Sequence, residues 1–351
     1  MKNDLSERKN VVLLVDNKHR DLMVATLIAH QLEETGVICH LEPLEAWRGV
    51  LAAYRPSMII FNHINATHLV QYSKRLAEMG VKTAVLPNEG ILYDPEVLNY
   101  NAGKHHNGAH IDMFFCWNQV HKDALLRCGF DQNTQIEVVG VPRFDYYFAP
   151  WSGIFDVQKR TPQGRPRLLF CTNFGFAKYY DLPKATAEEF MREYTCVSSY
   201  KDFWDLIETN HQCQQRFFDY ITAAVAADRF DITLRPHPNE KLSVYQQWLD
   251  KLKPEWRGRV RLDRETHITQ AILNCDLEIS CETCTTAMES WIAGKPTVEL
   301  VLKKHPVFYH KFHAGLNVAC EKPEDLPRIV EEELAHPRQE AQRAEHFTGL
   351  V

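Results

Sequence analysis

Short apolar runs that alternate with helical patterns are the strongest constraint on the fold of this chain. In the first half, apolar runs at 11–16, 38–44, 57–63 and 82–87 alternate with helical patterns near 21–36, 45–54 and 66–79. Runs this short with helices between them are typical of a parallel sheet, because parallel neighbours need a crossover connection. The alternation therefore predicts a doubly wound α/β domain with helices on both faces of its sheet.

A second series of apolar runs follows a stretch with weak periodicity. The runs cover 167–174, 230–238, 259–263, 276–280 and 296–301. The stretch 149–167 is rich in proline, glycine and basic residues, as linkers are. A chain of 351 residues also exceeds the size at which one core usually keeps growing. We therefore expect two Rossmann-like domains that face a central cleft.

The domain boundaries follow from these series. We place the first domain at 1–150, the linker at 151–166, the second domain at 167–330, and a C-terminal helix that packs back on the first domain at 331–351.

The composition argues against several functions. Hydrophobic residues make up 45% and charged residues 25%, as in ordinary globular proteins. The net charge of −6 does not favour nucleic-acid binding, which needs a basic surface. The N-terminus is polar, and no window approaches the roughly 18 apolar residues of a membrane span. We therefore expect a cytoplasmic protein that does not bind nucleic acid.

Cysteine and histidine spacings do not indicate a metal site. Of ten cysteines, only Cys281 and Cys284 form a CxxC pair, and no second pair or histidine stands at zinc-finger spacing. The histidine-rich loop 104–110 matches no established ligand pattern. We therefore expect neither a bound metal nor a cofactor.

The segment RPHPNE, residues 235–240, stands at the exit of a predicted strand. Pro236 and Pro238 stop the strand ladder and fix the backbone on both sides of His237. Arg235 and His237 can both donate to phosphate oxygens, and in α/β sheets ligands bind beyond the carboxyl ends of the strands. The segment predicts a phosphate or nucleotide site; the alternative is a structural histidine beside prolines.

A run of hydroxyl side chains opens the helix predicted at 284–293. Its members are Ser280, Thr283, Thr285 and Thr286. Hydroxyls and free N–H groups at a helix start can bind an anion such as phosphate, although threonines there can also act only as caps. Because this run and RPHP should end at the same edge of one sheet, we favour a shared phosphate site.

RPHPNE, the hydroxyl run and AMESWIAGKPTVEL together resemble the nucleotide-binding half of GT-B glycosyltransferases. More narrowly, the chain resembles bacterial capsule and lipopolysaccharide biosynthesis proteins that use CMP-activated sugars. The resemblance implies that a His-Pro motif, here His237 and Pro238, and the Ser/Thr motif hold the CMP phosphate and ribose. With these residues we group Glu289, in AMESWIAGK, and Asn173, at a strand exit of the second domain.

Landmarks in the first half resemble the same family. They are VDNKHRDL at 15–22, LPNEG at 86–90, FFCWNQVHKDALL at 114–126 and VVGVPRFD at 138–145. We expect polar residues in these landmarks and at the end of the run 57–63 to contact the donor sugar or the acceptor. These residues are Asp16, Lys18, Arg20, Asn62, Gly90 and Arg143.

Glu89 is the candidate catalytic carboxylate, with His237 as the second catalytic residue. Glu89 follows an apolar strand and precedes Gly90, so its side chain should point into the cleft. Sugar transfer needs a carboxylate to accept a proton from the acceptor or to stabilise the anomeric centre. In the resembled family an acidic motif ends in this Glu-Gly pair, and Asn88 replaces its first acid here. The alternative is an ordinary Pro-Asn-Glu-Gly turn.

The leading hypothesis is a glycosyltransferase that moves a pseudaminic, sialic, legionaminic or Kdo type sugar from CMP to a bacterial surface glycan. The partners would be the nucleotide-sugar donor and a glycan or lipid-linked glycan acceptor. Two alternatives stay open: a UDP-sugar, GDP-sugar or CDP-glycerol type transferase, and a non-catalytic nucleotide-sugar-binding protein. The lysines and aromatics of 300–313 also suit peripheral contact with the inner face of the inner membrane, with a solvated helix as the alternative.

Overall fold

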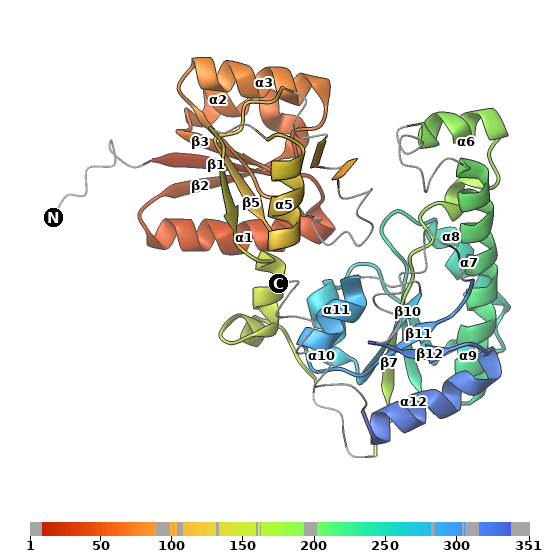
Figure 1. Ribbon diagram of the computed structural model, residues 1–351. Helices are drawn as coiled ribbons and strands as arrows, with labels where there is room; N and C mark the ends of the chain where they lie inside the picture. Colours follow the sequence, from red (N-terminus) through yellow and green to blue (C-terminus); the bar gives the residue numbers. More distant parts are fainter. Residues whose placement is uncertain are drawn as a thin grey trace. The chain divides into compact units, whose positions relative to one another are not determined.

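The computed structural model describes residues 9–88, 99–100, 102–103, 108–130, 133–158, 161, 163–192, 202–281, 285–303, 305 and 316–337. These residues divide into two units, one up to Arg143 and the other from Phe144 onward. Each unit contains one six-stranded parallel sheet with helices on both faces (Figure 1). The predicted fold class of two Rossmann-like, doubly wound sheets is therefore confirmed.

The first unit follows the predicted alternation of strands and helices. Its strands are β1 (Asn10–Val15), β2 (Ile38–Pro43), β3 (Met58–Phe61), β4 (Lys82–Val85), β5 (Met113–Cys116) and β6 (Gln135–Val138). Its helices are α1 (Lys18–Glu34), the 3-10 helix η2 (Leu44–Arg48), α2 (Val50–Tyr54), α3 (Thr67–Glu78) and α5 (Gln119–Arg127). The strand order is β2-β1-β3-β4-β5-β6, so the chain changes direction across the sheet between β1 and β3.

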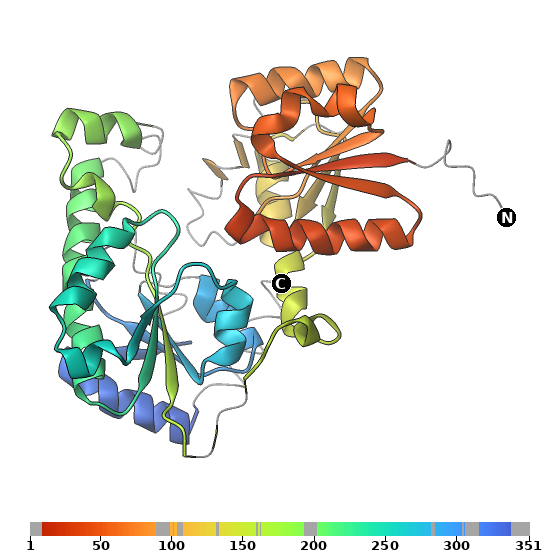
Figure 2. The ribbon, with the colours of Figure 1, turned by 180° about the vertical axis from the view of Figure 1, so that it is seen from behind.

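The alternation of side chains along β1 explains why both faces of this sheet are covered. Val11 and Leu13 face one side and pack in a cluster with Ala25 of α1. Val12 and Leu14 face the other side, in a cluster with apolar residues of α2, α3 and α5. A strand that is apolar at every position must be covered on both faces. Figure 2 shows α1 along one face of the sheet and α2 and α3 along the other.

The second unit repeats this architecture with a longer set of elements. Its strands are β7 (Arg167–Cys171), β8 (Asp231–Arg235), β9 (Val260–Leu262), β10 (Leu277–Cys281), β11 (Thr297–Leu300) and β12 (Val318–Cys320). Its α-helices are α6 (Lys184–Met191), α7 (Phe203–Ala226), α8 (Leu242–Lys251), α9 (Pro254–Arg257), α10 (Ile268–Asn274), α11 (Thr285–Ile292) and α12 (Leu326–Ala335). Among the described residues, 3-10 helices lie at η3 (Pro142–Tyr147), which begins at the end of the first unit, and at η4 (Trp151–Ile154), η5 (Ala177–Tyr179) and η8 (Pro323–Asp325).

The strand order of the second sheet defines its switch point. The order is β12-β11-β10-β7-β8-β9, so β7 and β10 are neighbours from which the chain winds outward in opposite directions. This is the strand order of dinucleotide-binding Rossmann folds, in which ligands bind beyond the carboxyl ends of the strands at the switch point. The exits of β7 and β10 are therefore the first place to look for a site.

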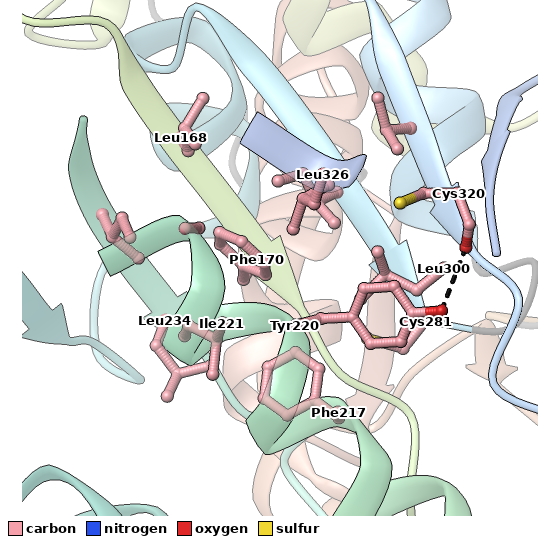
Figure 3. Close-up of a cluster of buried hydrophobic side chains, with 14 of the residues drawn as sticks. Leu168, Phe170, Phe217, Tyr220, Ile221, Leu234, Cys281, Leu300, Cys320 and Leu326 are labelled. Atoms are coloured by element: carbon pink, nitrogen blue, oxygen red, sulfur yellow. Dashed lines mark hydrogen bonds between the residues drawn. The ribbon is translucent and has the colours of Figure 1, made fainter. Parts of the chain in front are cut away.

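One face of the second sheet carries the largest apolar core. Phe170 of β7 and Leu234 of β8 pack against Phe217, Tyr220 and Ile221 of α7 (Figure 3). The Tyr220 hydroxyl donates to the Cys320 carbonyl at 3.3 Å, so the buried phenol is also hydrogen-bonded. The opposite face of the sheet is covered by α10 and α11 instead, and there the buried strand residues are mostly polar.

The structure differs from the expected elements in a few places. The helix expected at 45–54 is divided at Gly49 into the 3-10 helix η2, which follows Pro43, and the α-helix α2. Glycine destabilises a helix interior, so the break falls there. The strands β5, β6 and β12 extend the two sheets beyond the strands that the apolar runs predicted. Residues 144–158 cluster with the second unit.

Two expectations concern the membrane and the C-terminus. Among the described residues, none of the helices combines the length and apolar character needed to cross a bilayer. Most of the stretch 300–313 and all residues after 337 lie outside the described residues, so peripheral membrane contact and the packing of a terminal helix stay predictions.

Replacing Phe217 with alanine should destabilise the second unit. Its side chain is fully buried between α7 and the sheet, so truncation leaves a cavity worth about 3–5 kcal/mol of unfolding free energy. Urea denaturation followed by circular dichroism measures the change. Phe148→Ala is the matched control, because Phe148 is 57% exposed and should cost far less. Equal losses in the two variants would contradict this account of the core.

Candidate functional site

The exits of β7, β8 and β10 lie side by side because the three strands pair in parallel. Cys171 is opposite Arg235 on β8 and Ser280 on β10, so the residues that follow each strand emerge at one edge of the sheet. These residues are the segment 172–174, the RPHPNE segment and the start of α11. The predicted convergence of RPHP and the hydroxyl run on one edge is what the structure shows.

His237 is half-buried, and its backbone is held from two sides. Its N–H lies 3.2 Å from both Thr172 Oγ1 and Glu240 Oε1. Its ring Nδ1 accepts from the Asn239 N–H at 3.2 Å, so a neutral His237 carries its proton on Nε2. The ring can therefore donate from Nε2 while the backbone stays fixed.

Glu240 organises this edge of the sheet, although its position in the sequence does not single it out. It is 4% exposed, and its Oε1 accepts from Thr172 Oγ1 at 2.8 Å and from the Phe174 N–H at 2.9 Å. Its Oε2 accepts from the Tyr245 hydroxyl of α8. Burial raises the pKa of Glu240, and these hydrogen bonds oppose that rise. The buried Glu240 carboxyl group therefore connects the RPHPNE segment to the segment after β7 and to α8.

Two residues of the RPHPNE segment have partners on the β9 side of the sheet. Arg235 donates from Nη1 to the Thr266 carbonyl at 2.5 Å. Pro238 is exposed, and its carbonyl accepts from the Arg264 guanidinium. The Arg235 guanidinium, proposed from the sequence as a phosphate ligand, is thus hydrogen-bonded to the loop after β9.

The hydroxyl run is divided between a buried and an accessible part. Ser280 is fully buried, and its Oγ lies 2.7 Å from Oε1 of Glu278, two residues earlier on β10. Thr286 Oγ1 lies 3.1 Å from the same carboxyl oxygen. Thr285 is half-buried and makes no side-chain hydrogen bond with another described residue. Thr283 lies outside the described residues.

Glu278 is the second buried carboxyl that the sequence did not single out. Burial raises its pKa to about 8, the hydroxyls of Ser280 and Thr286 oppose the rise, and the nearby Glu299 carboxyl adds to it. It stands on the strand face below α11, where Thr297 and Glu299 of β11 are also buried. A polar layer therefore supports the start of α11.

Two further residues of the predicted nucleotide site differ in their surroundings. Asn173 follows β7, is half-buried and makes no side-chain hydrogen bond with another described residue. Glu289 is 2% exposed on α11, and its Oε2 accepts from the Tyr147 hydroxyl at 2.6 Å. Asn173 is thus available for a ligand, and Glu289 links α11 to η3.

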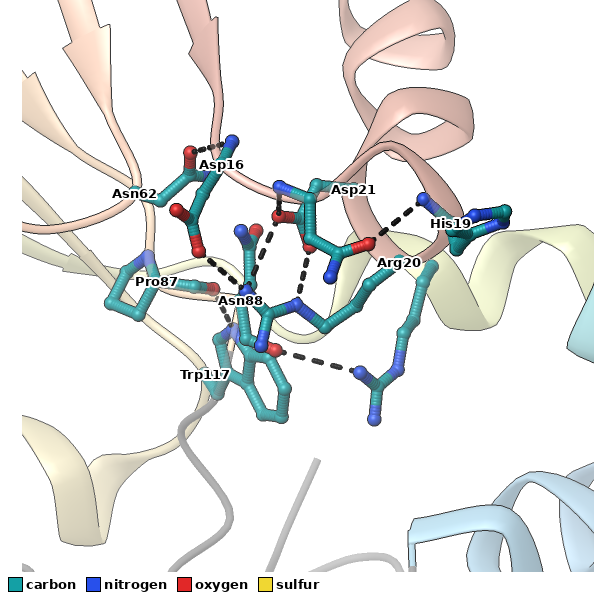
Figure 4. A network of polar contacts seen from close by, with 10 residues as sticks. Asp16, His19, Arg20, Asp21, Asn62, Pro87, Asn88 and Trp117 are labelled. Atoms are coloured by element: carbon teal, nitrogen blue, oxygen red, sulfur yellow. Dashed lines mark hydrogen bonds and ion pairs between the residues drawn. The ribbon is translucent and has the colours of Figure 1, made fainter. Parts of the chain in front are cut away.

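The first unit has a polar network at its own switch point, between the exits of β1 and β3. The Asn62 side chain accepts from the Asp16 N–H at 3.2 Å. Arg20 pairs with Asp16 at 3.1 Å and with the buried Asp21 at 2.7 Å (Figure 4). Asp21 also accepts from the Asn17 N–H at 2.8 Å, which holds the start of α1 against the strand exits. The structure thus brings Asp16, Arg20 and Asn62 together.

Arg143 borders the same network from the end of the first unit. Its guanidinium lies over the Trp117 ring at 5.1 Å, and its Nη1 donates to the Asn88 carbonyl at 3.4 Å. Trp117 in turn donates from Nε1 to the Pro87 carbonyl at 2.7 Å. A small pocket is lined by residues of this region, among them Arg20, Asn88 and Arg143.

The Lys18 side chain has no hydrogen bond or ion pair with this network, and two other predicted sugar or catalytic residues lie outside the described part of the chain. Lys18 is exposed and makes no side-chain hydrogen bond with another described residue. Glu89 and Gly90 lie outside the described residues, so their proposed roles are untested. Within the described part of the chain, no group of three or more His, Cys, Asp or Glu side chains could hold a metal ion.

Comparison with known proteins identifies the fold. No protein-family model and no curated protein matches the sequence. Among solved structures, an S. aureus MnaA-UDP co-structure has a TM-score of 0.57 at 12% identity, over 96% of this chain and 91% of that chain. A UDP-N-acetylglucosamine 2-epimerase has a TM-score of 0.57 at 11% identity, over 96% and 90%. Sucrose-phosphate synthase from Thermosynechococcus elongatus has a TM-score of 0.51 at 11% identity, over 98% and 95%.

The chain has the GT-B fold. At this level of identity the likeness concerns the path of the chain and not its activity. The GT-B fold class expected from the sequence is confirmed, whereas the narrower resemblance to CMP-sugar enzymes of surface-glycan synthesis is not tested by these structures.

The stability of the protein should depend on the proton of Glu278. Its pKa rises from 4.5 to about 8 on folding, so the native state binds more protons than the unfolded state between these values. Stability should therefore fall as the pH rises through this window, by at most about 1.4 kcal/mol per pH unit from this group. Glu278→Gln, which stays neutral, should flatten the decline in melting temperature between pH 5.5 and 8.5.

Glu255→Gln is the control for this experiment, because Glu255 is exposed on α9. Its pH dependence should match that of the wild type. If Glu278→Gln showed the same decline as these two proteins, the carboxyl would already be ionised throughout the range.

Proposed function

We propose that this protein is a glycosyltransferase that uses a nucleotide-sugar donor and holds the donor phosphate at the switch point of the second sheet. The observation that carries the proposal is the meeting of Asn173, His237 and Thr285 at the exits of three adjacent strands. All three are half-buried, and Asn173 and Thr285 make no side-chain hydrogen bond with a described residue. The N–H groups that open α11 add the partial positive charge that favours a phosphate.

The proposed donor is a CMP-activated nonulosonic or ulosonic acid, and the proposed acceptor is a bacterial surface glycan. Support for this donor comes from RPHPNE and the Ser/Thr run, on which the resemblance to CMP-sugar enzymes rests. Such a sugar carries a carboxylate of its own. Arg20 and Arg143, in the polar network of the first unit, are cations of the kind that bind carboxylates in pairs of hydrogen bonds.

The proposed chemistry assigns one task to each group. His237 donates from Nε2 to the phosphate that leaves with the nucleotide, where negative charge grows as the glycosidic bond breaks. Glu89 accepts the proton of the acceptor hydroxyl or stabilises the anomeric centre. Asn173 and Thr285 hold the phosphate or ribose through neutral hydrogen bonds.

A UDP-sugar enzyme is the second candidate. The MnaA structure, which has one of the higher TM-scores, is a complex with UDP, and another similar structure is a UDP-N-acetylglucosamine 2-epimerase. A UDP-sugar adds one more phosphate to the ligand than a CMP-sugar does. The two candidates therefore differ in the anion that the switch point must hold.

The nucleotide specificity should appear in a calorimetric titration with CMP, UMP, CDP, UDP and GDP. We expect CMP to bind most tightly, because the proposed donor carries one phosphate between cytidine and sugar. Binding of UDP with no measurable affinity for CMP would replace the first candidate with the second. Failure of every nucleotide to bind would remove the proposed function itself.

Substitution of His237 by alanine should lower turnover and leave the fold intact. Loss of one donor to a developing charge in a desolvated site is worth about 2–4 kcal/mol, or roughly 30- to 1000-fold in rate. Release of CMP from the donor measures the rate, and circular dichroism measures the fold. His336→Ala, which removes an exposed histidine after α12, should leave the rate unchanged.

The opposite result would assign His237 a structural role. If His237→Ala lowers the melting temperature strongly while the remaining folded protein keeps full activity, His237 is a structural histidine between prolines. Turnover by the wild type that is abolished in Glu89→Gln would in addition exclude a non-catalytic nucleotide-sugar-binding protein.

A further inference from the structure

The carboxylate of Glu240 connects the two strand exits that carry the proposed phosphate ligands. At the β7 exit it accepts from the Thr172 hydroxyl at 2.8 Å and from the Phe174 N–H at 2.9 Å. At the β8 exit it lies 3.2 Å from the His237 N–H. All three donors reach the same oxygen, Oε1. One buried atom therefore fixes the distance between the two exits.

Asn173 lies between the two residues that Glu240 holds on the β7 side. Phe174 donates its N–H to Oε1, and Thr172 donates its side-chain hydroxyl to Oε1 and its N–H to the Arg235 carbonyl at 3.2 Å, so the chain is held on each side of Asn173. His237 is fixed in the same way by its own N–H and by the prolines that flank it. The Asn173 and His237 side chains thus start from two backbone positions that share one anchor.

The second oxygen of Glu240 ties this anchor to the helices. Oε2 accepts from the Tyr245 hydroxyl, and that hydroxyl also lies 3.2 Å from Gln214 Nε2 of α7 and 3.3 Å from Thr172 Oγ1. Tyr245 is fully buried in the apolar core between α8 and the sheet. The anchor is therefore part of the rigid body of the unit and not of its surface loops.

We propose that Glu240 is a positioning residue of the donor site, which holds Asn173 and His237 at the spacing that the phosphate of the nucleotide requires. The inference rests on the proposed function, because it assigns the two strand exits to a nucleotide. Glu240 itself is buried and does not contact the ligand. It acts through the backbone of the residues that do.

The chemistry of the anchor explains why a carboxylate stands there. A carboxylate accepts at both oxygens, which matches donors on both sides. In glutamine, one of these oxygens becomes an NH2 donor. At the Oε2 position the NH2 requires the Tyr245 hydroxyl to turn from donor to acceptor, and at the Oε1 position it faces the N–H groups of Phe174 and His237, which cannot accept. The shape of the side chain is preserved and its hydrogen-bond pattern is not. Glu240→Gln therefore tests the anchor with little change in volume.

The experiment measures the affinity for CMP, or for UDP if the wild type prefers it, by NMR titration. In Glu240→Gln we expect affinity to fall by about 10-fold, because the two strand exits lose their common anchor. Glu333→Gln is the matched control, since Glu333 is also a fully buried glutamate of this unit, on α12. It should lower the melting temperature and leave the affinity unchanged.

A second background separates positioning from a general effect on the fold. When both proposed ligands are already removed, in Asn173→Ala/His237→Ala, adding Glu240→Gln should weaken binding by less than about twofold, since contacts that act through each other are not additive. The same 10-fold loss in both backgrounds would overturn the proposal, because Glu240 would then act by a route that does not involve these residues.

The remaining outcomes distinguish this inference from the proposed function. If the wild type binds no nucleotide, the proposed function fails and the inference fails with it. If the wild type binds and Glu240→Gln binds equally well, only the inference fails. If Glu240→Gln does not fold, Tyr245→Phe decides, because it removes the donor to Oε2 and leaves the three donors to Oε1 in place. We expect a loss in affinity of about threefold in that variant, and an unchanged affinity would overturn the proposal.

Discussion

Parallel pairing of β10, β7 and β8 is the constraint on which the second unit depends. Parallel strands end at one edge of the sheet, so residues far apart in the sequence emerge together once the register is set. The pairing of Cys171 with both Arg235 and Ser280 sets that register. Because the strand order reverses between β7 and β10, the crossover connections leave this edge in opposite directions, and in such sheets this leaves space for a ligand. The proposed site uses that space.

Two buried carboxyl groups, Glu240 and Glu278, support this edge. Glu240 accepts hydrogen bonds from both strand exits and from Tyr245, a pattern that suits an ionised carboxylate. The pKa of Glu278 is raised to about 8 by burial, so at neutral pH it is mainly protonated. A neutral Glu278 below α11 leaves the positive helix start without an opposing charge. On the α11 side of the edge, the partial positive charge of the helix start therefore favours an anion.

The sequence predicted the architecture because hydrophobic periodicity decides it locally. Strands such as β1, apolar at each position from Val11 to Val15, can only be buried on both faces, which gives the doubly wound sheet. Because parallel strands end at the same edge of the sheet, polar residues that follow them, as in RPHPNE and the hydroxyl run, can be assigned to that edge before any contact is known. What cannot be read from periodicity is the direction of each side chain. Arg235 and Ser280 have side chains that can bind a phosphate. In the structure, however, the guanidinium donates a hydrogen bond to the Thr266 carbonyl and the hydroxyl donates one to the Glu278 carboxyl group.

The same contacts narrow the proposed site to fewer groups than the motifs suggest. Glu278 engages the hydroxyls of Ser280 and Thr286, and the β9 side engages Arg235. Among the described residues, the proposed phosphate contacts therefore fall to Asn173, His237, Thr285 and the N–H groups that open α11. Apart from His237 when protonated, these groups are neutral donors. Such a site depends on exact placement more than on charge, since each neutral hydrogen bond is weak and sensitive to distance. That dependence gives a physical reason for the prolines around His237 and for the buried Glu240 that fixes its backbone.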